Sequence, residues 1–299
     1  MNARAQIRLL PDGRRLHLQD GPIDLIVEAF GEPGEIERAY RAACVRFETL
    51  LDELCGELAV LRCRCTPESQ WPRGAVARRM MAAVMPYASK YFLTPMAAVA
   101  GAVAEEILAA MLAAAALSRA YVNDGGDIAL HLGPREKFVV GMVERPDRPS
   151  LLGTTMLTSE DPVRGIATSG WRGRSFSLGI ADAVTVLADR AAAADAAATI
   201  IANAVDLPGH AAVVRIPARE LAPDSDLENL LVTQAVGELS AAEVHKALAA
   251  GARTAERLLR IGLIRAAALH LRRETRVVGA IDGSRLISTA VQERGLVHA

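Results

Sequence analysis

The order of the strand-like and helix-like segments constrains the fold of this chain more than any other feature. Residues 7–30 read as short strands, because Pro11-Asp12-Gly13 and Asp20-Gly21-Pro22 place turn signals between apolar runs. Apolar residues then recur at helical spacing from Pro33, which suits the first turn of a helix, to about residue 61. Strands and helices therefore cluster and do not alternate in regular β-α-β units. We predict an α+β architecture and not a doubly wound sheet.

Strands and helices also cluster in the rest of the chain. We predict that residues 1–284 form a single domain. The segment 120–143 reads as β, with 137–143 returning as a hairpin after the Gly133-Pro134 turn. A helix over 189–205 has Asp189 as its N-cap. Residues 285–299 read as a loosely ordered tail. Further helices are expected over 76–85 and 95–118, further strands over 166–169, 183–187 and 213–216, and a mostly helical C-terminal region over 227–232, 241–261 and 264–271.

The composition indicates which classes of partner and which cellular location to expect for the protein. Only 4% of the 299 residues are aromatic although 51% are hydrophobic, so the core must be packed from small aliphatic side chains. The formal net charge is −1, which gives no overall field to attract nucleic acid or an anionic membrane. There is no secretory h-region, and Glu105 and Glu106 interrupt the most apolar stretch. We expect a cytoplasmic protein with neither a nucleic acid nor a membrane as partner.

The cysteines indicate neither a disulfide scaffold nor a metal site. Four cysteines in 299 residues are too few to hold a small loop-rich fold together. Cys63 and Cys65 form a Cys-x-Cys pair, but no second Cys or His pair at metal-binding spacing lies nearby. We interpret all four as reduced thiols.

A pair of glycines interrupts the strand pattern at Asn123-Asp124-Gly125-Gly126-Asp127. Glycines at the end of a strand let another backbone or a ligand approach closely, and the flanking polar side chains Asn123 and Asp127 add hydrogen-bonding groups. An ordinary bulge or turn explains the same residues. Both interpretations stay open at this point.

Two further segments place oxygen atoms on regular elements. In Thr168-Ser169-Gly170 a strand delivers two hydroxyls and then a glycine, which suits a phosphate or a polar ring as well as a simple strand end. The nearby Arg172 and Arg174 could add positive charge for an anionic ligand.

Asp195 and Thr199 stand at i and i+4 of the expected helix and so share one face. A carboxylate and a hydroxyl can hold Mg²⁺ together with water and phosphate. Alternatively, Thr199 bonds back to the carbonyl of Asp195 and the carboxylate is solvated.

The order of these segments is more informative than any one of them. A small-residue helix from Met96 to Glu106 precedes the Gly-Gly-Asp strand, then Thr-Ser-Gly, then Val184-Thr185-Val186 and the Asp195-x-x-x-Thr199 helix. Over residues 95–207 this order resembles the ApbE superfamily, the FAD:protein FMN transferases and their relatives. It is most similar to a less characterised cytoplasmic branch.

The resemblance implies an ApbE-type α+β fold with β-sheets flanked by helices. It implies a small-molecule ligand, FAD or FMN, in one cleft, and Mg²⁺ bridging the FAD pyrophosphate while a protein hydroxyl takes FMN. Asp195 and Thr199 would match the metal-holding pair. The ligand-contacting residues would be Asn123, Gly125, Gly126, Asp127, Thr168, Ser169 and Gly170.

The sequence departs from the transferase pattern in ways that keep three hypotheses open. Ala100 replaces a lysine, Glu105 stands where the family has Asp, and Leu178 lies near the position of a histidine. The first hypothesis is Mg²⁺-dependent FMN or nucleotidyl transfer, with no catalytic residue assigned. The second is a cleft reassigned to another anionic nitrogen heterocycle. The third is a non-enzymatic maturation partner of a flavoprotein. In that case the alanine-rich helices could form an oligomer interface, and a homo-oligomer is one such assembly.

Overall fold

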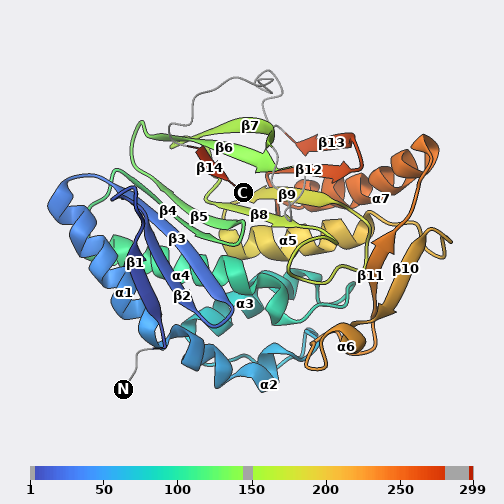
Figure 1. Cartoon of the computed structure of the whole chain (residues 1–299), viewed down its shortest axis with the longest axis horizontal. Helices are drawn as coiled ribbons and strands as arrows, with labels where there is room; N and C mark the ends of the chain where they lie inside the picture. The colour runs from blue at the N-terminus through green and yellow to red at the C-terminus, as the bar shows by residue number, and fades with distance from the viewer. Residues whose placement is uncertain (1–3, 144–150, 280–295, 299) are drawn as a thin grey trace. The chain divides into compact units, whose positions relative to one another are not determined.

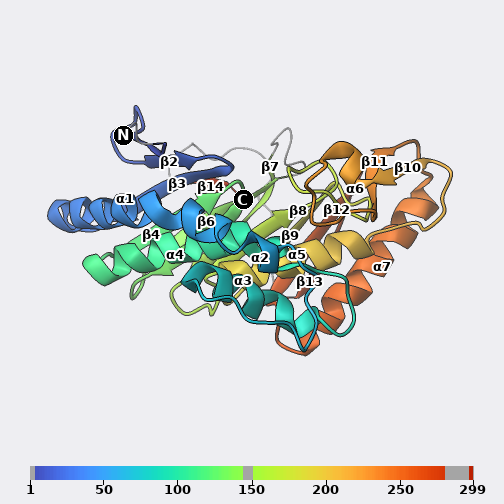
Figure 2. The ribbon, with the colours of Figure 1, turned by 90° about the horizontal axis from the view of Figure 1, so that it is seen from below.

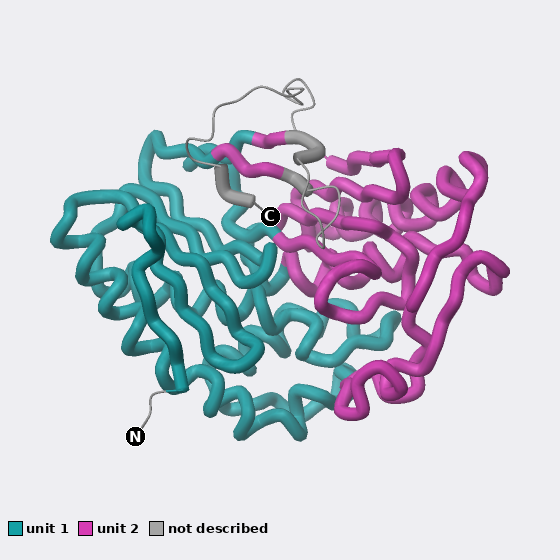
Figure 3. Tube along the Cα trace, viewed as in Figure 1, with its two compact units in different colours: residues 1–138, 156–166, 189–193 teal, residues 139–155, 167–188, 194–299 magenta. Residues whose placement is uncertain are grey.

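The chain forms two compact units in a computed structural model that describes residues 4–143, 151–279 and 296–298. Figure 3 shows unit 1 in teal, made of residues 1–138, 156–166 and 189–193, and unit 2 in magenta, made of residues 139–155, 167–188 and 194–299. Each unit is described by itself, so the expectation of a single domain over residues 1–284 stays a prediction. Most of the expected tail, residues 285–295 and 299, lies outside the described residues.

An antiparallel sheet forms one side of unit 1 (Figure 1). The strands predicted for residues 7–30 are confirmed. The start of β8 joins this sheet through the pairing of Ile166 with Ile128. The strands of the sheet, in spatial order, are β1 (Gln6–Leu9), β2 (Leu16–Asp20), β3 (Ile23–Phe30), β4 (Arg119–Asp124), β5 (Asp127–Leu132) and β8 (Gly165–Ser169).

Two long helices cover this sheet. They are α1 (Pro33–Cys55), which packs on β2 and β3, and α4 (Val99–Ala114), which packs on β4 and β5. The two helices also contact each other, as Figure 2 shows. Their inner faces carry fully buried side chains, among them Phe47 on α1 and Ile107 on α4. The smaller helices of unit 1 are α2 (Leu58–Leu61), α3 (Ala75–Val84) and the single 3-10 turns Met85–Tyr87 and Pro95–Ala98.

The segment Pro95–Ala114 is long and apolar enough to cross a membrane by length and composition alone, and 44% of its window is buried. Within unit 1, however, α4 contacts α1, α3, β4 and β5. Its two carboxylates, Glu105 and Glu106, form ion pairs with arginines of that unit. We interpret α4 as the core helix of unit 1.

Unit 2 is organised around the strand β12 (Ala266–Leu271), which lies antiparallel between β9 (Ala183–Ala188) and β13 (Glu274–Gly279). The helix α7 (Ala241–Arg260) packs on β12 and β13. A separate pair joins β10 (Val213–Pro217) to β11 (Leu231–Val236). The other elements of this part of the chain are α5 (Ala191–Ala204), α6 (Ala218–Leu221), and the small sheet of β14 (Leu296–His298), β6 (Lys137–Val143) and β7 (Leu151–Thr158).

The α+β class is confirmed, and three local predictions are corrected. Residues 137–143 do not return as a hairpin on β5, because β6 pairs with β14 and β7 instead. The C-terminal region is not mostly helical: 231–236 and 266–271 are strands, and only α7 confirms the expected helix there. The helix expected over 33–61 ends at Cys55 and resumes as α2. Of the expected tail, residues 296–298 form the short strand β14, and its loose order stays a prediction.

Candidate functional site

The two glycines of the Gly-Gly-Asp segment form a hairpin turn in unit 1. Asp124 pairs with Asp127 across the ends of β4 and β5, which leaves Gly125 and Gly126 as the two loop residues. Their φ angles are +63° and +110°, in the region that a two-residue hairpin of this kind requires and that favours glycine. The Asn123 Oδ1 accepts a hydrogen bond of 2.8 Å from the Gly126 N–H. The turn interpretation explains both glycines locally, and ligand contact by residues 123–127 stays a prediction.

The Thr168-Ser169-Gly170 segment lies at the end of β8 in unit 2. The hydroxyls of Thr168 and Thr185 are 2.9 Å apart, and Thr185 is buried on β9. Ser169 is half-buried. A Cβ on Gly170 would lie 3.0 Å from the carbonyl oxygen of Ala181, and the backbone of Asp182 is also within reach. Gly170 is thus explained by close packing of two backbones, and a binding role for the hydroxyls of Thr168 and Ser169 stays a prediction.

Asp182 organises the backbone after β8, a role that the sequence reading did not assign. Its side chain is 6% exposed. The Oδ1 atom accepts hydrogen bonds of 3.2 Å from the Trp171 indole N–H and from the Arg172 Nε. The Oδ2 atom accepts one of 2.6 Å from the backbone N–H of Arg272, between β12 and β13. The signal in the sequence was an aspartate inside the apolar run Ile180-Ala181-Asp182-Ala183-Val184, because a buried carboxylate needs several donors.

The predicted metal pair lies on α5. Asp195 and Thr199 are both half-buried, and the alanines between them are buried. Within the described part of the chain, no group of three or more His, Cys, Asp or Glu side chains could hold a metal ion. A carboxylate and a hydroxyl are hard oxygen donors that fit Mg²⁺. The remaining positions of such an ion would have to be filled by water and by oxygens of the ligand.

The first turn of α5 is held by residues of unit 1. The Oε1 atom of Glu105 accepts a hydrogen bond of 2.9 Å from the Ala192 N–H, and its Oε2 accepts one of 2.7 Å from Arg190. A carboxylate at this position satisfies an amide of the first turn and is favoured by the helix dipole. Asp189, the predicted N-cap, lies two residues before the helix. The Glu105 side chain is 11% exposed, so this carboxylate faces the start of α5 and not the solvent.

Two glycines allow this close approach. A Cβ on Gly101 of α4 would lie 2.7 Å from the backbone nitrogen of Ala192 and closer still to the carbonyl oxygen of Ala191. A Cβ on Gly165 of β8 would collide with the backbone of Arg190 and Ala191. The segment at the start of α5 therefore fits only because these two positions lack a side chain.

A half-buried ion-pair cluster joins the helices of unit 1. Glu106 accepts hydrogen bonds from Arg46 on α1, at 2.7 Å, and from Arg79 on α3. Burial raises the pKa of the Glu106 carboxyl, but the hydrogen bonds from Arg79 and Arg46 outweigh it and hold the pKa below its ordinary value. These charges stabilise the packing of α1, α3 and α4, and we assign them no chemistry.

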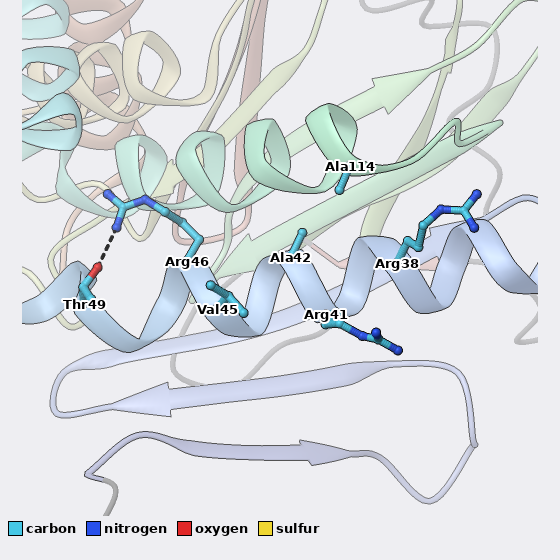
Figure 4. Close-up of a pocket in the computed structure, with 7 residues that line it drawn as sticks. All are labelled: Arg38, Arg41, Ala42, Val45, Arg46, Thr49 and Ala114. Atoms are coloured by element: carbon cyan, nitrogen blue, oxygen red, sulfur yellow. Dashed lines mark hydrogen bonds between the residues drawn. The ribbon is translucent and has the colours of Figure 1, made fainter.

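A shallow groove on α1 is lined by none of the predicted ligand residues. Figure 4 shows Ala42 and Val45 of α1 with Ala114 at the end of α4, and arginines at the rim. The rim arginines are engaged: Arg38 pairs with Glu35, Arg41 with Glu37, and Arg46 with Glu53. The groove offers alanine and valine methyl groups and no reactive group.

The predicted site residues thus fall into two sets. Residues 168–170, Asp195 and Thr199 belong to unit 2, and the strand end carrying the first three is fixed there by Asp182. Residues 123–127 belong to unit 1. Their convergence on one cleft stays a prediction.

A family model described as AbpE bacteria matches residues 7–278, and the chain belongs to this family. The resemblance to the ApbE-like superfamily, first read from residues 95–207, is therefore confirmed.

Curated relatives of the chain include several UPF0280 proteins. A UPF0280 protein of Methanopyrus kandleri is 42% identical over 128 residues, covering 43% of this chain and 48% of that protein. One of Methanosarcina acetivorans is 35% identical over 187 residues, covering 61% of this chain and 70% of that protein. The chain spans about half the length of the first of these relatives.

Similar solved structures include two flavin transferases. The flavinyl transferase ApbE of Pseudomonas stutzeri, in its apo form, has a TM-score of 0.33 at 13% identity, covering 62% of this chain and 51% of that one. The flavin transferase ApbE of Vibrio cholerae has a TM-score of 0.29 at 13% identity, covering 66% and 85%.

Proposed function

We propose that this protein binds a flavin nucleotide in an Mg²⁺-dependent manner and transfers FMN or a nucleotidyl group from FAD. The observation that carries the proposal is family membership over residues 7–278, because it spans every segment whose order resembles the flavin transferases. Two solved proteins that this chain resembles are named flavin transferases.

The chemistry of the residues in unit 2 supports a phosphate-bearing ligand. Thr168 and Ser169 offer hydroxyls at the end of β8, and Arg172 adds a guanidinium three residues beyond Ser169. On α5, the Asp195 carboxylate and the Thr199 hydroxyl would hold Mg²⁺. When bound, the metal would neutralise charge on the pyrophosphate. The role of the chain's own residues is then to bind and orient the nucleotide.

A titration of FAD into the purified protein tests the proposal. With Mg²⁺ present, we expect saturable quenching of FAD fluorescence, and chelation by EDTA should weaken binding at least tenfold. Asp195→Ala should bind weakly in both conditions, since the carboxylate ligand is gone. Asp189→Ala is the matched control, because it removes a carboxylate just before α5 and should keep the Mg²⁺ dependence. FAD binding that is equally tight with and without EDTA, or no FAD binding at all, would contradict the proposal.

A second candidate function is favoured by two substitutions at the transferase positions. Ala100 and Leu178 supply neither the amine nor the imidazole found there in the resembling family. The Leu178 backbone N–H donates to the Asn203 side chain at 2.9 Å, so this loop is anchored without a titratable group. On this view, the protein binds another anionic nitrogen heterocycle without transferring FMN. A thermal-shift screen separates the two, because stabilisation by a heterocyclic carboxylate and not by FAD supports the second candidate.

A further inference from the structure

We propose that Arg172, stacked on Trp171 and fixed by Asp182, recognises the phosphate of the ligand, with Asp182 as its positioning residue. The inference deepens the proposed function and rests on it, since it assumes that a flavin nucleotide binds beside Thr168 and Ser169. It goes further because it names the side chain, Arg172, by which the protein would bind a phosphorylated flavin more tightly than an unphosphorylated one.

The backbone places Arg172 next to the two hydroxyls. Residues 170–173 form a tight turn directly after β8, in which the Gly173 N–H donates to the Gly170 carbonyl at 3.1 Å. The Trp171 N–H donates to the Ala181 carbonyl at 3.0 Å, which ties the turn to the chain entering β9. The turn that carries Arg172 therefore cannot swing away from the end of β8 without breaking these bonds.

The guanidinium of Arg172 lies over the Trp171 ring and leaves part of its donor set available. Its Cζ lies 4.1 Å from the centre of the Trp171 ring, and its Nε donates to Asp182 at 3.2 Å. Among the described residues, every hydrogen bond of Arg172 comes from this Nε. The side chain is 23% exposed, so part of it is open to solvent. A preoriented planar fork of this kind suits bidentate binding of a phosphate.

Asp182 is suited to positioning and not to binding the ligand itself. Its side chain is 6% exposed, and its two oxygens accept from Trp171, Arg172 and the Arg272 N–H. The stack and the guanidinium are thus oriented by one carboxylate that is anchored between β12 and β13. Because a carboxylate this close to a phosphate would repel it unless shielded, its burial behind Trp171 and Arg172 is consistent with an indirect role.

A comparison of FMN with riboflavin tests the inference, because the two differ only in the phosphate. We expect the wild-type protein to bind FMN more tightly than riboflavin. Arg172→Ala should weaken FMN binding about 10- to 100-fold, as for the loss of a hydrogen bond to a charged group. It should leave riboflavin binding within about threefold. Arg172→Lys keeps the charge and should retain part of the preference for FMN.

Asp182→Asn tests the positioning role. It should lower the preference for FMN less than Arg172→Ala does, and it should add nothing when combined with Arg172→Ala. Arg253→Ala is the control for charge, since it removes an exposed arginine of α7 to which no binding role is assigned and should leave the preference unchanged.

The outcomes separate the two proposals. An Arg172→Ala protein that keeps the wild-type preference for FMN, or that loses FMN and riboflavin binding equally, overturns the inference alone. A wild-type protein that binds neither flavin overturns the proposed function together with the inference.

Discussion

Replacing one glycine by alanine should change the stability of the protein by different amounts in three helices. The contacts around each glycine predict the order of these changes. In an exposed helix interior, Gly→Ala stabilises by about 1 kcal/mol, because glycine loses more backbone freedom on folding. At Gly101 the new Cβ would lie 2.7 Å from the Ala192 nitrogen and closer still to the Ala191 carbonyl oxygen. Those are backbone atoms, which cannot rotate aside as a side chain can.

The cost at Gly101 follows from what surrounds it. Overpacking a tight core costs about 1–3 kcal/mol, and the upper end applies because Glu105 and Gly165 also hold the Ala191 segment in place. Subtracting the gain in helix propensity leaves a loss of about 2 kcal/mol. At a scale of about 2–4 °C for each kcal/mol, Tm should fall by about 4–8 °C.

The other two glycines are matched controls. Gly34 in the first turn of α1 has Arg38 Nη1, the end of a flexible side chain, as its nearest neighbour at 3.8 Å. Gly34→Ala should therefore leave Tm unchanged or raise it. A Cβ on Gly251 of α7 would meet the side chains of Val205 and Leu269, the latter at 2.7 Å. The Tm of Gly251→Ala should therefore lie between those of Gly101→Ala and Gly34→Ala. Differential scanning calorimetry suits this series because two units need not unfold in one step. A Gly101→Ala protein as stable as the Gly34→Ala protein would refute the reasoning.

Three further predictions concern other parts of the chain. Ser240 caps α7 by accepting from the Glu243 N–H, so Ser240→Ala should cost about 1 kcal/mol, measured as a lower urea midpoint. The Ser240 backbone N–H, followed by His210, lowers the pKa of Glu243 to about 2. Its stabilising effect should be complete above the ordinary pKa of 4.5 and be lost as the pH falls from there to about 2, and an NMR titration midpoint near 4.5 would contradict the capping box. Cys55 and Cys63 are exposed and should react with Ellman's reagent in the native protein. Burial raises the pKa of the Cys65 thiol, which should react only after unfolding.

The fold was predictable where local signals agree with burial. Pro33 and the apolar spacing after it predicted the start of α1, and the Pro11-Asp12-Gly13 turn separates β1 from β2 as expected. Residues 266–271 read Ala-Ala-Ala-Leu-His-Leu, which favours a helix on propensity. The segment is instead a strand buried on both faces between β9 and β13, so tertiary packing overrode the local preference.

The candidate site divides in the same way. Thr168 and Ser169 stand on a strand and Asp195 and Thr199 on a helix, as the patterns predicted. The roles of Asp182 and Glu105 were missed, because each depends on partners that are distant in the sequence. The sequence around a single carboxylate does not indicate which distant backbone amide it will bind.

The central claim is that a nucleotide and its metal bind at Thr168, Ser169, Asp195 and Thr199. A crystal structure grown with FAD and Mn²⁺ in place of Mg²⁺ tests it most directly, because Mn²⁺ gives an anomalous signal. We predict an anomalous peak in contact with the Asp195 carboxylate and the Thr199 hydroxyl, with the flavin phosphates beside Ser169 and Arg172. A bound flavin elsewhere on the protein, with no metal peak at Asp195, would contradict the account.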